Sequence, residues 1–351
     1  MPTLQPQMEH QQLADIFANP RYLVHRPPFP AFPIINSPKG SLKTQNPFSG
    51  CLIHHNPNPI MPTIAQILQT APIPRNETRL LLQHITGYTA SQLITRDRES
   101  LPERQAARLQ QLIAQRSAGV PIAYLVGTRE FYGRSFAVSR AVLIPRPETE
   151  HLLEAALQRL PANGTLWDLG TGSGIIAISA KLERPDATVY ASDLSPAALK
   201  IARQNAKTLG ADITLAQGSW FEADVIDRTH PRKRLFRLPQ RLADVVVSNP
   251  PYIDVNDAHL QQGDLRYEPP HALTDFADGL AHIRHIAQHA PAYLRDNGWL
   301  LLEHGYDQGQ TVRNILAQWN YSQIETQQDL AGLDRVTIGR VEAALPLCPN
   351  L

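Results

Sequence analysis

The stretch TLWDLGTGSG, residues 165–174, decides the fold of this chain. Its first half has the apolar character of a strand, and glycine then occupies every second position. Residues 175–182, which follow directly, have the pattern of a helix. Glycine lets the backbone turn sharply and come close to a ligand. A strand, a glycine-rich turn and a helix in this order predict an α/β domain that binds a ligand at the turn.

The chain continues to alternate between predicted strands and helices on the C-terminal side of this stretch. The further predicted strands are residues 188–191, 213–216, 243–249, 299–302 and 336–339, and the predicted helices are residues 196–209, 280–294 and 310–319. An alternation of this length predicts a doubly wound, mostly parallel sheet. Ligands in such sheets lie just beyond the carboxyl ends of the strands, so residues at these ends are the candidates for chemistry.

Asp193 lies at the end of the strand predicted around residues 188–191, which is the first strand after the glycine-rich turn. A carboxylate in this position can accept hydrogen bonds from both hydroxyls of a ribose. The glycine spacing departs from the dinucleotide fingerprint, because Ile176 and Ala177 follow Gly174. The glycine-rich turn and Asp193 together therefore favour an adenosine-containing ligand other than a dinucleotide. The alternative is a structural turn with an aspartate that caps the next helix.

The motif NPPY, residues 249–252, follows the apolar run ADVVV at residues 243–247. The run is typical of a buried parallel strand, which the prolines end abruptly. The side-chain oxygen of Asn249 and the carbonyls of Pro250 and Pro251 can accept hydrogen bonds, while Tyr252 offers a flat face. These groups suit a planar amide or amino nitrogen as substrate. The alternative is a proline-stopped strand end with a buried tyrosine.

Two further groups of side chains are weaker candidates. Trp220 follows Ser219 after the third predicted strand, and its ring either stacks on an adenine or lies half-buried at an interface. His282, His285 and His289 share one face of a predicted helix. A solvated helix face is favoured over a metal site, because no carboxylate or cysteine partner converges on them in the sequence.

Composition excludes several classes of protein. The chain has 351 residues, with 33 basic and 32 acidic ones, so no overall field favours nucleic acid. Its two cysteines, Cys51 and Cys348, exclude a disulfide framework and a cysteine-based zinc site. No run is long enough to span a bilayer and no signal peptide is recognisable, so we expect a soluble, cytoplasmic protein. The basic stretch at residues 228–241 is interpreted as a solvated loop, with RNA or an acidic partner surface as the alternative.

The sequence divides into segments of different character. Residues 1–60 are rich in proline without helical or strand periodicity, and we expect them to be disordered, as a tail or an over-extended start. Residues 61–128 carry apolar positions at helical spacing and predict a small helical domain. Residues 129–140 predict a hairpin linker with a glycine turn. Residues 141–342 form the predicted catalytic domain, and residues 343–351 form a tail.

The combined motifs resemble one family, the HemK/PrmC release-factor glutamine methyltransferases. The residues that carry the resemblance are IPRPETE at 144–150, the loop at 168–174, Asp193, and NPPYID at 249–254. Supporting matches are PIAYL at 121–125, REF at 129–131, Glu268-Pro269, and LLLEHG at 300–305. These matches are collinear from about residue 61 to residue 340, so together they are far more specific than any single motif.

The resemblance implies an S-adenosyl-L-methionine-dependent enzyme that needs no metal and methylates the N5 nitrogen of a glutamine. The implied glutamine lies in the Gly-Gly-Gln motif of class I peptide chain release factors, which the helical domain would help to hold. The implied fold is a Rossmann-like class I methyltransferase sheet with a small N-terminal helical domain. The implied donor-binding residues are Gly170, Thr171, Gly172, Ser173, Gly174, Asp193, Trp220 and Asn249. The catalytic candidates are Asn249, Pro250 and Tyr252, and the substrate-binding candidates are these three with Pro251 and Arg146.

The sequence departs from the family pattern in residues 1–60, in the length of the basic stretch, and at Ser219, where the family commonly has an acidic residue. We expect a monomer without direct DNA or membrane binding. The competing interpretations are an adenine-N6 methyltransferase of DNA or RNA, a non-catalytic nucleotide-binding module and a dehydrogenase. Near-zero net charge disfavours the first, the intact motifs disfavour the second, and the missing dinucleotide spacing disfavours the third.

Overall fold

A computed structural model describes residues 61–226 and 234–342. The proline-rich segment 1–60 and the tail 343–351, for which the sequence predicts disorder and a tail, lie outside the described residues. All the described residues belong to one contact unit, Pro59–Leu351. Among them, no helix is long and apolar enough to cross a membrane.

The first described segment is a set of short helices, as the apolar spacing predicts. Thr63 and Thr89 each begin a helix with a capping box, in which the threonine side chain accepts from the backbone of a glutamine three residues on. Gly87 ends another helix in the left-handed conformation (φ 73°). Their apolar faces form a separate core around Leu81, Leu82 and others. The helices are α2 (Ile64–Thr70), α3 (Arg75–Thr86), α4 (Ala90–Thr95), α5 (Glu103–Ser117) and α6 (Ile122–Val126).

A two-stranded hairpin follows the helices, which confirms the predicted hairpin. It pairs β1 (Thr128–Phe131) with β2 (Arg134–Ala137) in antiparallel register. Tyr132 and Gly133 form the turn with positive φ angles of 49° and 69°. Phe131 and Phe136 are buried and meet edge to face, with ring centroids 6.2 Å apart.

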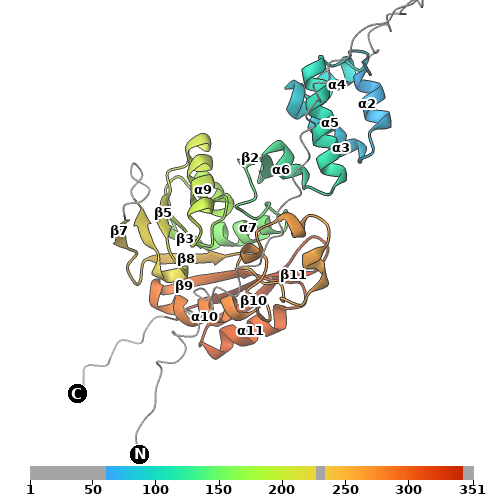
Figure 1. The fold of residues 1–351 in the computed structure, drawn as a ribbon. Helices are drawn as coiled ribbons and strands as arrows, with labels where there is room; N and C mark the ends of the chain where they lie inside the picture. The colour runs from blue at the N-terminus through green and yellow to red at the C-terminus, as the bar shows by residue number, and fades with distance from the viewer. Residues whose placement is uncertain (1–60, 227–233, 343–351) are drawn as a thin grey trace, which may run out of the picture. The chain divides into compact units, whose positions relative to one another are not determined.

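The remaining strands form one nine-stranded sheet in the order β10-β11-β9-β8-β3-β4-β5-β6-β7 (Figure 1). The five strands from β9 to β5 are parallel, whereas β11, β10, β6 and β7 join antiparallel. The sheet is therefore parallel at its centre and mixed at its edges. Its strands are β3 (Thr165–Leu169), β4 (Thr188–Asp193), β5 (Thr214–Gln217), β6 (Asp224–Ile226), β7 (Arg234–Arg237), β8 (Ala243–Ser248), β9 (Leu294–Glu303), β10 (Ser322–Gln328) and β11 (Asp334–Arg340).

The interpretation of residues 228–241 as a loop is wrong for residues 234–237, which form a strand. Arg234–Arg237 pairs with β6 at the edge of the sheet. An edge strand tolerates a basic sequence because one side of its backbone and much of its side-chain surface remain in solvent. Residues 227–233 lie outside the described chain.

Helices cover both faces of the sheet, as a doubly wound fold requires. Successive residues of β8 show the two faces, because Val245 and Val247 belong to one core cluster and Val246 to the other. The helices are α7 (Thr149–Arg159), α8 (Ile175–Glu183), α9 (Pro196–Leu209), α10 (Ala281–Tyr293) and α11 (Gly309–Gln318). Short 3₁₀ turns are η2 (Trp220–Glu222), η3 (Ala258–Gln261), η4 (Leu265–Tyr267) and η5 (Pro270–Ala272).

Candidate active site

The glycine-rich turn lies between β3 and α8 and is held by the end of β4. The backbone N–H groups of Gly170 and Thr171 both donate to the carbonyl of Ser192, at 2.9 Å each. Gly172 has φ 56°, and a Cβ there would meet no heavy atom within 4 Å, so the turn borders open space. Gly174 is needed for packing, because a Cβ would lie 2.7 Å from Ile178 Cδ1. The turn therefore offers backbone to a ligand on one side and packs against α8 on the other.

Asp193 ends β4 and uses both carboxylate oxygens to order its surroundings. Oδ2 accepts from Gly172 N at 2.9 Å, and Oδ1 accepts from Ser195 N at 2.8 Å. Burial raises the pKa of this carboxyl, against the two backbone hydrogen bonds. The cap of α9 is Ser195, whose side chain accepts from Ala198 N, so the alternative role of Asp193 as the helix cap is wrong. Asp193 instead ties the glycine turn to the end of its own strand.

A second carboxyl, that of Asp168, lies fully buried beneath the turn. Its Oδ2 accepts from Thr171 Oγ1 at 2.6 Å and from Ala177 N at 3.3 Å. Within the described chain, its Oδ1 is buried without a hydrogen-bond partner. Burial raises the pKa of Asp168 to about 7. Above this pKa the carboxylate Oδ1 is an unpartnered acceptor, which suits a ligand that brings a hydrogen-bond donor.

The buried Asp168 predicts a stability that falls as pH rises. The folded protein holds a proton on this carboxyl up to a pKa of about 7, whereas the unfolded chain releases it near 3.8. The folded state thus binds more protons than the unfolded chain between these two pKa values. The resulting contribution to the free energy of unfolding is lost as pH rises through about 7. From pH 5 to pH 7 the loss amounts to about 2 kcal/mol.

Chemical denaturation of wild type and Asp168→Asn at several pH values measures this contribution. The difference between their unfolding free energies should change by that amount, because the amide that replaces the carboxyl in the variant does not titrate. Asp296→Asn, at a half-exposed position, is the matched control and should parallel wild type. Parallel curves for wild type and Asp168→Asn would contradict the assignment.

Trp220 lies beside the glycine turn. Its Cζ3 would be 3.6 Å from a Cβ on Gly170, and its ring centroid is 5.0 Å from that of His282. It is also packed against one of the two core clusters of the sheet. Both sequence interpretations, adenine stacking and a half-buried interface tryptophan, are compatible with this position.

The three histidines of α10 are half-buried, so the expected solvated face is wrong. His282 packs on Trp220, and the rings of His285 and His289 are stacked with centroids 4.2 Å apart. The backbone carbonyl of His285 lies 2.8 Å from His289 Nδ1. Across residues 61–226 and 234–342, no group of three or more His, Cys, Asp or Glu side chains is arranged to hold a metal ion.

The NPPY motif begins where β8 ends, next to the glycine turn. The parallel register pairs Ser248 with Leu169, so Asn249 and Gly170 leave neighbouring strands at the same edge. Asn249 Nδ2 donates to Thr149 Oγ1 at 3.2 Å, and the Tyr252 hydroxyl donates to Glu303 Oε1 at 3.5 Å. The structure thus brings Asn249 and the donor-binding candidates of the turn to one sheet edge, as the sequence predicts.

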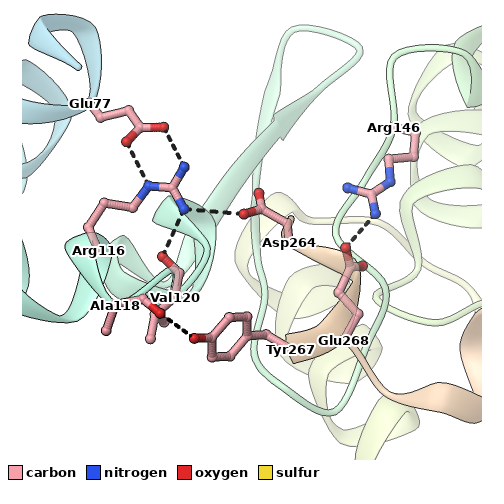
Figure 2. Close-up of polar contacts among 8 residues, drawn as sticks. All are labelled: Glu77, Arg116, Ala118, Val120, Arg146, Asp264, Tyr267 and Glu268. Atoms are coloured by element: carbon pink, nitrogen blue, oxygen red, sulfur yellow. Dashed lines mark hydrogen bonds and ion pairs between the residues drawn. The ribbon is translucent and has the colours of Figure 1, made fainter. Parts of the chain in front are cut away.

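Arg146 is fixed by a buried carboxylate. Figure 2 shows its guanidinium donating to Oε1 of Glu268, whose Oε2 accepts from Ile144 N at 2.9 Å. Glu268 is 3% exposed, and burial raises its pKa, against the neighbouring positive charge of Arg146. The pair joins the segment before α7 to residues that follow NPPY.

The residues just before Glu268 contact the N-terminal helices (Figure 2). Arg116 binds Glu77 through two hydrogen bonds of 2.6 and 2.8 Å and also donates to Asp264 at 3.2 Å. Tyr267 donates its hydroxyl proton to the carbonyl of Ala118 at 2.6 Å. Residues 264–268, which follow NPPY in the chain, are therefore tied both to the C-terminal end of α5 and to Arg146.

Sequence reasoning did not assign roles to Asp168, Thr149, Glu268 or Glu303. Glu303 had a usable signal, because it ends the strand that neighbours β8 and lies at the same carboxyl edge. Thr149 lies within the quoted IPRPETE run but carries no chemical signature of its own. Glu268 meets Ile144 across 124 positions of sequence, and no local pattern reports such a contact.

The fold and the relatives described below place the chain among the class I S-adenosylmethionine-dependent methyltransferases. A family model described as PrmC N-terminal domain matches residues 63–127, and one described as methyltransferase small domain matches residues 148–263. The chain belongs to the release factor glutamine methyltransferase family. This assignment rests on curated relatives that it matches along almost their whole length.

The relative from Neisseria gonorrhoeae, named release factor glutamine methyltransferase, is 53% identical over 278 residues, or 79% of this chain and 97% of its own. A relative of the same name from Burkholderia pseudomallei is 45% identical over 287 residues, or 80% and 96%. Among solved structures, a methyltransferase from Pyrococcus furiosus aligns with a TM-score of 0.45 and 14% identity, covering 69% of this chain and all of its own.

Proposed function

We propose that this enzyme transfers a methyl group from S-adenosyl-L-methionine to the side-chain N5 of the glutamine in the Gly-Gly-Gln motif of class I release factors. The observation that carries the proposal is the placement of Asn249 and Pro250 at the end of β8, one strand from the glycine turn. Relatives named for the same activity support the substrate class.

The residues around the glycine turn fit the donor. Asp193 has lone pairs beyond those given to Gly172 and Ser195, which a ribose can use. The unpartnered Oδ1 of Asp168 suits an ammonium group, and Trp220 lies where an adenine ring could stack. When bound, S-adenosylmethionine supplies an electrophilic methyl group.

The task of the chain's own residues is to make an amide nitrogen nucleophilic. An amide nitrogen reacts poorly because its lone pair is delocalised into the carbonyl, so positioning carries much of the catalysis. Holding the reactants in line is worth about 7–11 kcal/mol in favourable intramolecular cases. The prolines after Asn249 restrict the backbone and so limit movement of the acceptor groups.

Hydrogen-bond acceptors provide the second contribution. As the nitrogen becomes positive, its two hydrogens become stronger donors, so acceptors fixed near them bind the transition state more tightly than the ground state. Asn249 Oδ1 and the Pro250 carbonyl take this role, and Tyr252 packs against the amide plane. The methylated product releases its extra proton to water, so the chain needs no strong base.

The release factor itself is proposed to contact the N-terminal helices and Arg146. Asp264 and Tyr267 join residues 264–268, which follow NPPY in the chain, to the C-terminal end of α5. A protein held by the helices therefore lies close to these residues. Recognition of a folded protein in this way requires no nucleic acid, which agrees with the balance of 33 basic and 32 acidic residues.

Transfer of labelled methyl groups tests the proposal. The enzyme is mixed with labelled S-adenosylmethionine and a release factor that carries either Gly-Gly-Gln or Gly-Gly-Ala, and DNA of mixed sequence forms a third arm. We expect label only with Gly-Gly-Gln, on the N5 nitrogen by mass spectrometry. Equal labelling of the Gly-Gly-Ala protein, or labelling of adenine in the DNA arm alone, would overturn it.

A further inference from the structure

Two buried side chains, those of Thr149 and Glu303, lie next to the proposed acceptor Asn249. Asn249 donates through Nδ2 to the hydroxyl oxygen of Thr149 at 3.2 Å. Thr149 opens α7 and is 1% exposed, and Glu303 ends β9 and is also 1% exposed. The register of β8 with β9 pairs Ser248 with Leu302, which places Glu303 beside Asn249 at the sheet edge.

Glu303 lies close to two hydroxyl-bearing side chains, those of Tyr252 and Thr149. Tyr252 donates to its Oε1, and hydrogen bonding from Thr149 is the largest influence that lowers its pKa. Burial acts more strongly in the opposite direction and raises that pKa to about 7. Arg335 lowers it further and Glu148 raises it, so the carboxyl lies among charges of both signs.

A hydroxyl that gives its proton to one neighbour can fix the direction of an amide on its other side. A hydroxyl has one proton, and when that proton goes to Glu303 its oxygen can only accept. Asn249 must then present its NH₂ group to Thr149, which turns Oδ1 to the opposite side. Within the described chain, the structure pairs no donor with this Oδ1, so it remains available to a substrate amide.

We propose that Glu303 and Thr149 are positioning residues that set the polarity of the Asn249 amide and so keep its oxygen turned toward the glutamine nitrogen. The proposal rests on the proposed role of Asn249. An asparagine side chain has two nearly isosteric ends, of which only one can stabilise a nitrogen that becomes positive. The reversed amide would direct NH₂ hydrogens at the hydrogens of the substrate.

The cost of burying Glu303 supports a role beyond stability. Its Oε2 is buried without a hydrogen-bond partner in the described residues. An apolar side chain of similar size generally serves a buried position as well or better. A carboxyl kept at this place therefore acts through what it accepts, namely the protons of Thr149 and Tyr252.

Two variants of Thr149 test the proposed contacts from Glu303 through Thr149 to Asn249, which we call the relay. Thr149→Val keeps the shape and removes the hydroxyl, whereas Thr149→Ser keeps the hydroxyl. We expect Thr149→Val to lower kcat about tenfold, with the affinity for S-adenosylmethionine unchanged, and Thr149→Ser to remain close to wild type. Wild-type kcat in Thr149→Val, or an equal loss in both variants, would overturn the proposal.

A double-mutant cycle separates this inference from the proposed function. In the Asn249→Ala background, Thr149→Val should cause no further loss of kcat, because there is no amide left to orient. Full activity of Asn249→Ala would refute the role of Asn249 itself. A large loss in Asn249→Ala together with the same tenfold effect of Thr149→Val in both backgrounds would refute only the relay.

Glu303→Met tests the far end of the relay. Methionine is unbranched and similar in size but accepts no proton from Thr149. We expect kcat to fall about tenfold while the unfolding midpoint stays equal or rises. A purely structural carboxyl would instead give a lower midpoint with normal kcat, and that result would remove Glu303 from the relay.

Discussion

Asn249→Ala is expected to lower kcat by about 10²–10³, the effect of deleting one preorganised polar contact to a transition state. The expected effect is large because the oxygen of Asn249 meets a hydrogen whose positive charge grows only as the methyl group transfers. The affinity for S-adenosylmethionine should change little, since the glycine turn and Asp193 do not depend on Asn249 for their hydrogen bonds. Steady-state kinetics with release factor, and calorimetry with the donor, measure the two quantities.

Asn314→Ala is the matched control. Asn314 is an exposed residue of α11 whose side chain accepts from Gln310 at 2.9 Å. This variant should keep wild-type kcat and donor affinity. Wild-type turnover in Asn249→Ala would remove Asn249 from catalysis, and a matching loss of donor affinity would reassign it to the donor site.

Asp193→Ala is expected to weaken donor binding by about 100- to 10,000-fold. The variant loses two proposed ribose hydrogen bonds to a charged acceptor, each worth about 1.5–3 kcal/mol. It also frees Gly172 N and Ser195 N, which Asp193 holds at 2.9 and 2.8 Å, so the glycine turn loses its tie to β4. Isothermal calorimetry with S-adenosylmethionine measures the change.

Asp296→Ala is the control for this prediction. Asp296 is about half exposed and pairs with Arg241, and exposed pairs contribute little. Its donor affinity should equal that of wild type. An Asp193→Ala protein that is folded and binds the donor with normal affinity would exclude Asp193 from the ribose site.

The centre of the fold could be predicted because its signals are local. Long apolar runs, glycine turns and helical periods each act within about ten residues, and they identify β3, β4, β5, β8 and β9 together with the helices α8, α9 and α10. Predicted residues 196–209 coincide with α9, for example. The carboxyl-edge rule then places Asp193 and Asn249 at one edge from the sequence alone.

The sheet edges and the supports of the site could not be predicted in the same way. Strands β6 and β7 are short and polar or basic, and β10 reads SQIETQQ, without an apolar run. Pairing with a neighbour, which the local sequence does not record, makes them strands. The contacts of Glu268 with Ile144 and of Thr149 with Asn249 join residues more than 90 positions apart, so only the folded chain reveals them.

A crystal structure of the enzyme with S-adenosylhomocysteine and a release factor fragment containing Gly-Gly-Gln tests the central claim most directly. We predict that the glutamine side-chain nitrogen lies within about 3.2 Å of both Asn249 Oδ1 and the Pro250 carbonyl, with Nδ2 of Asn249 on Thr149. A glutamine nitrogen bound to other groups, with Asn249 turned away from it, would contradict the account.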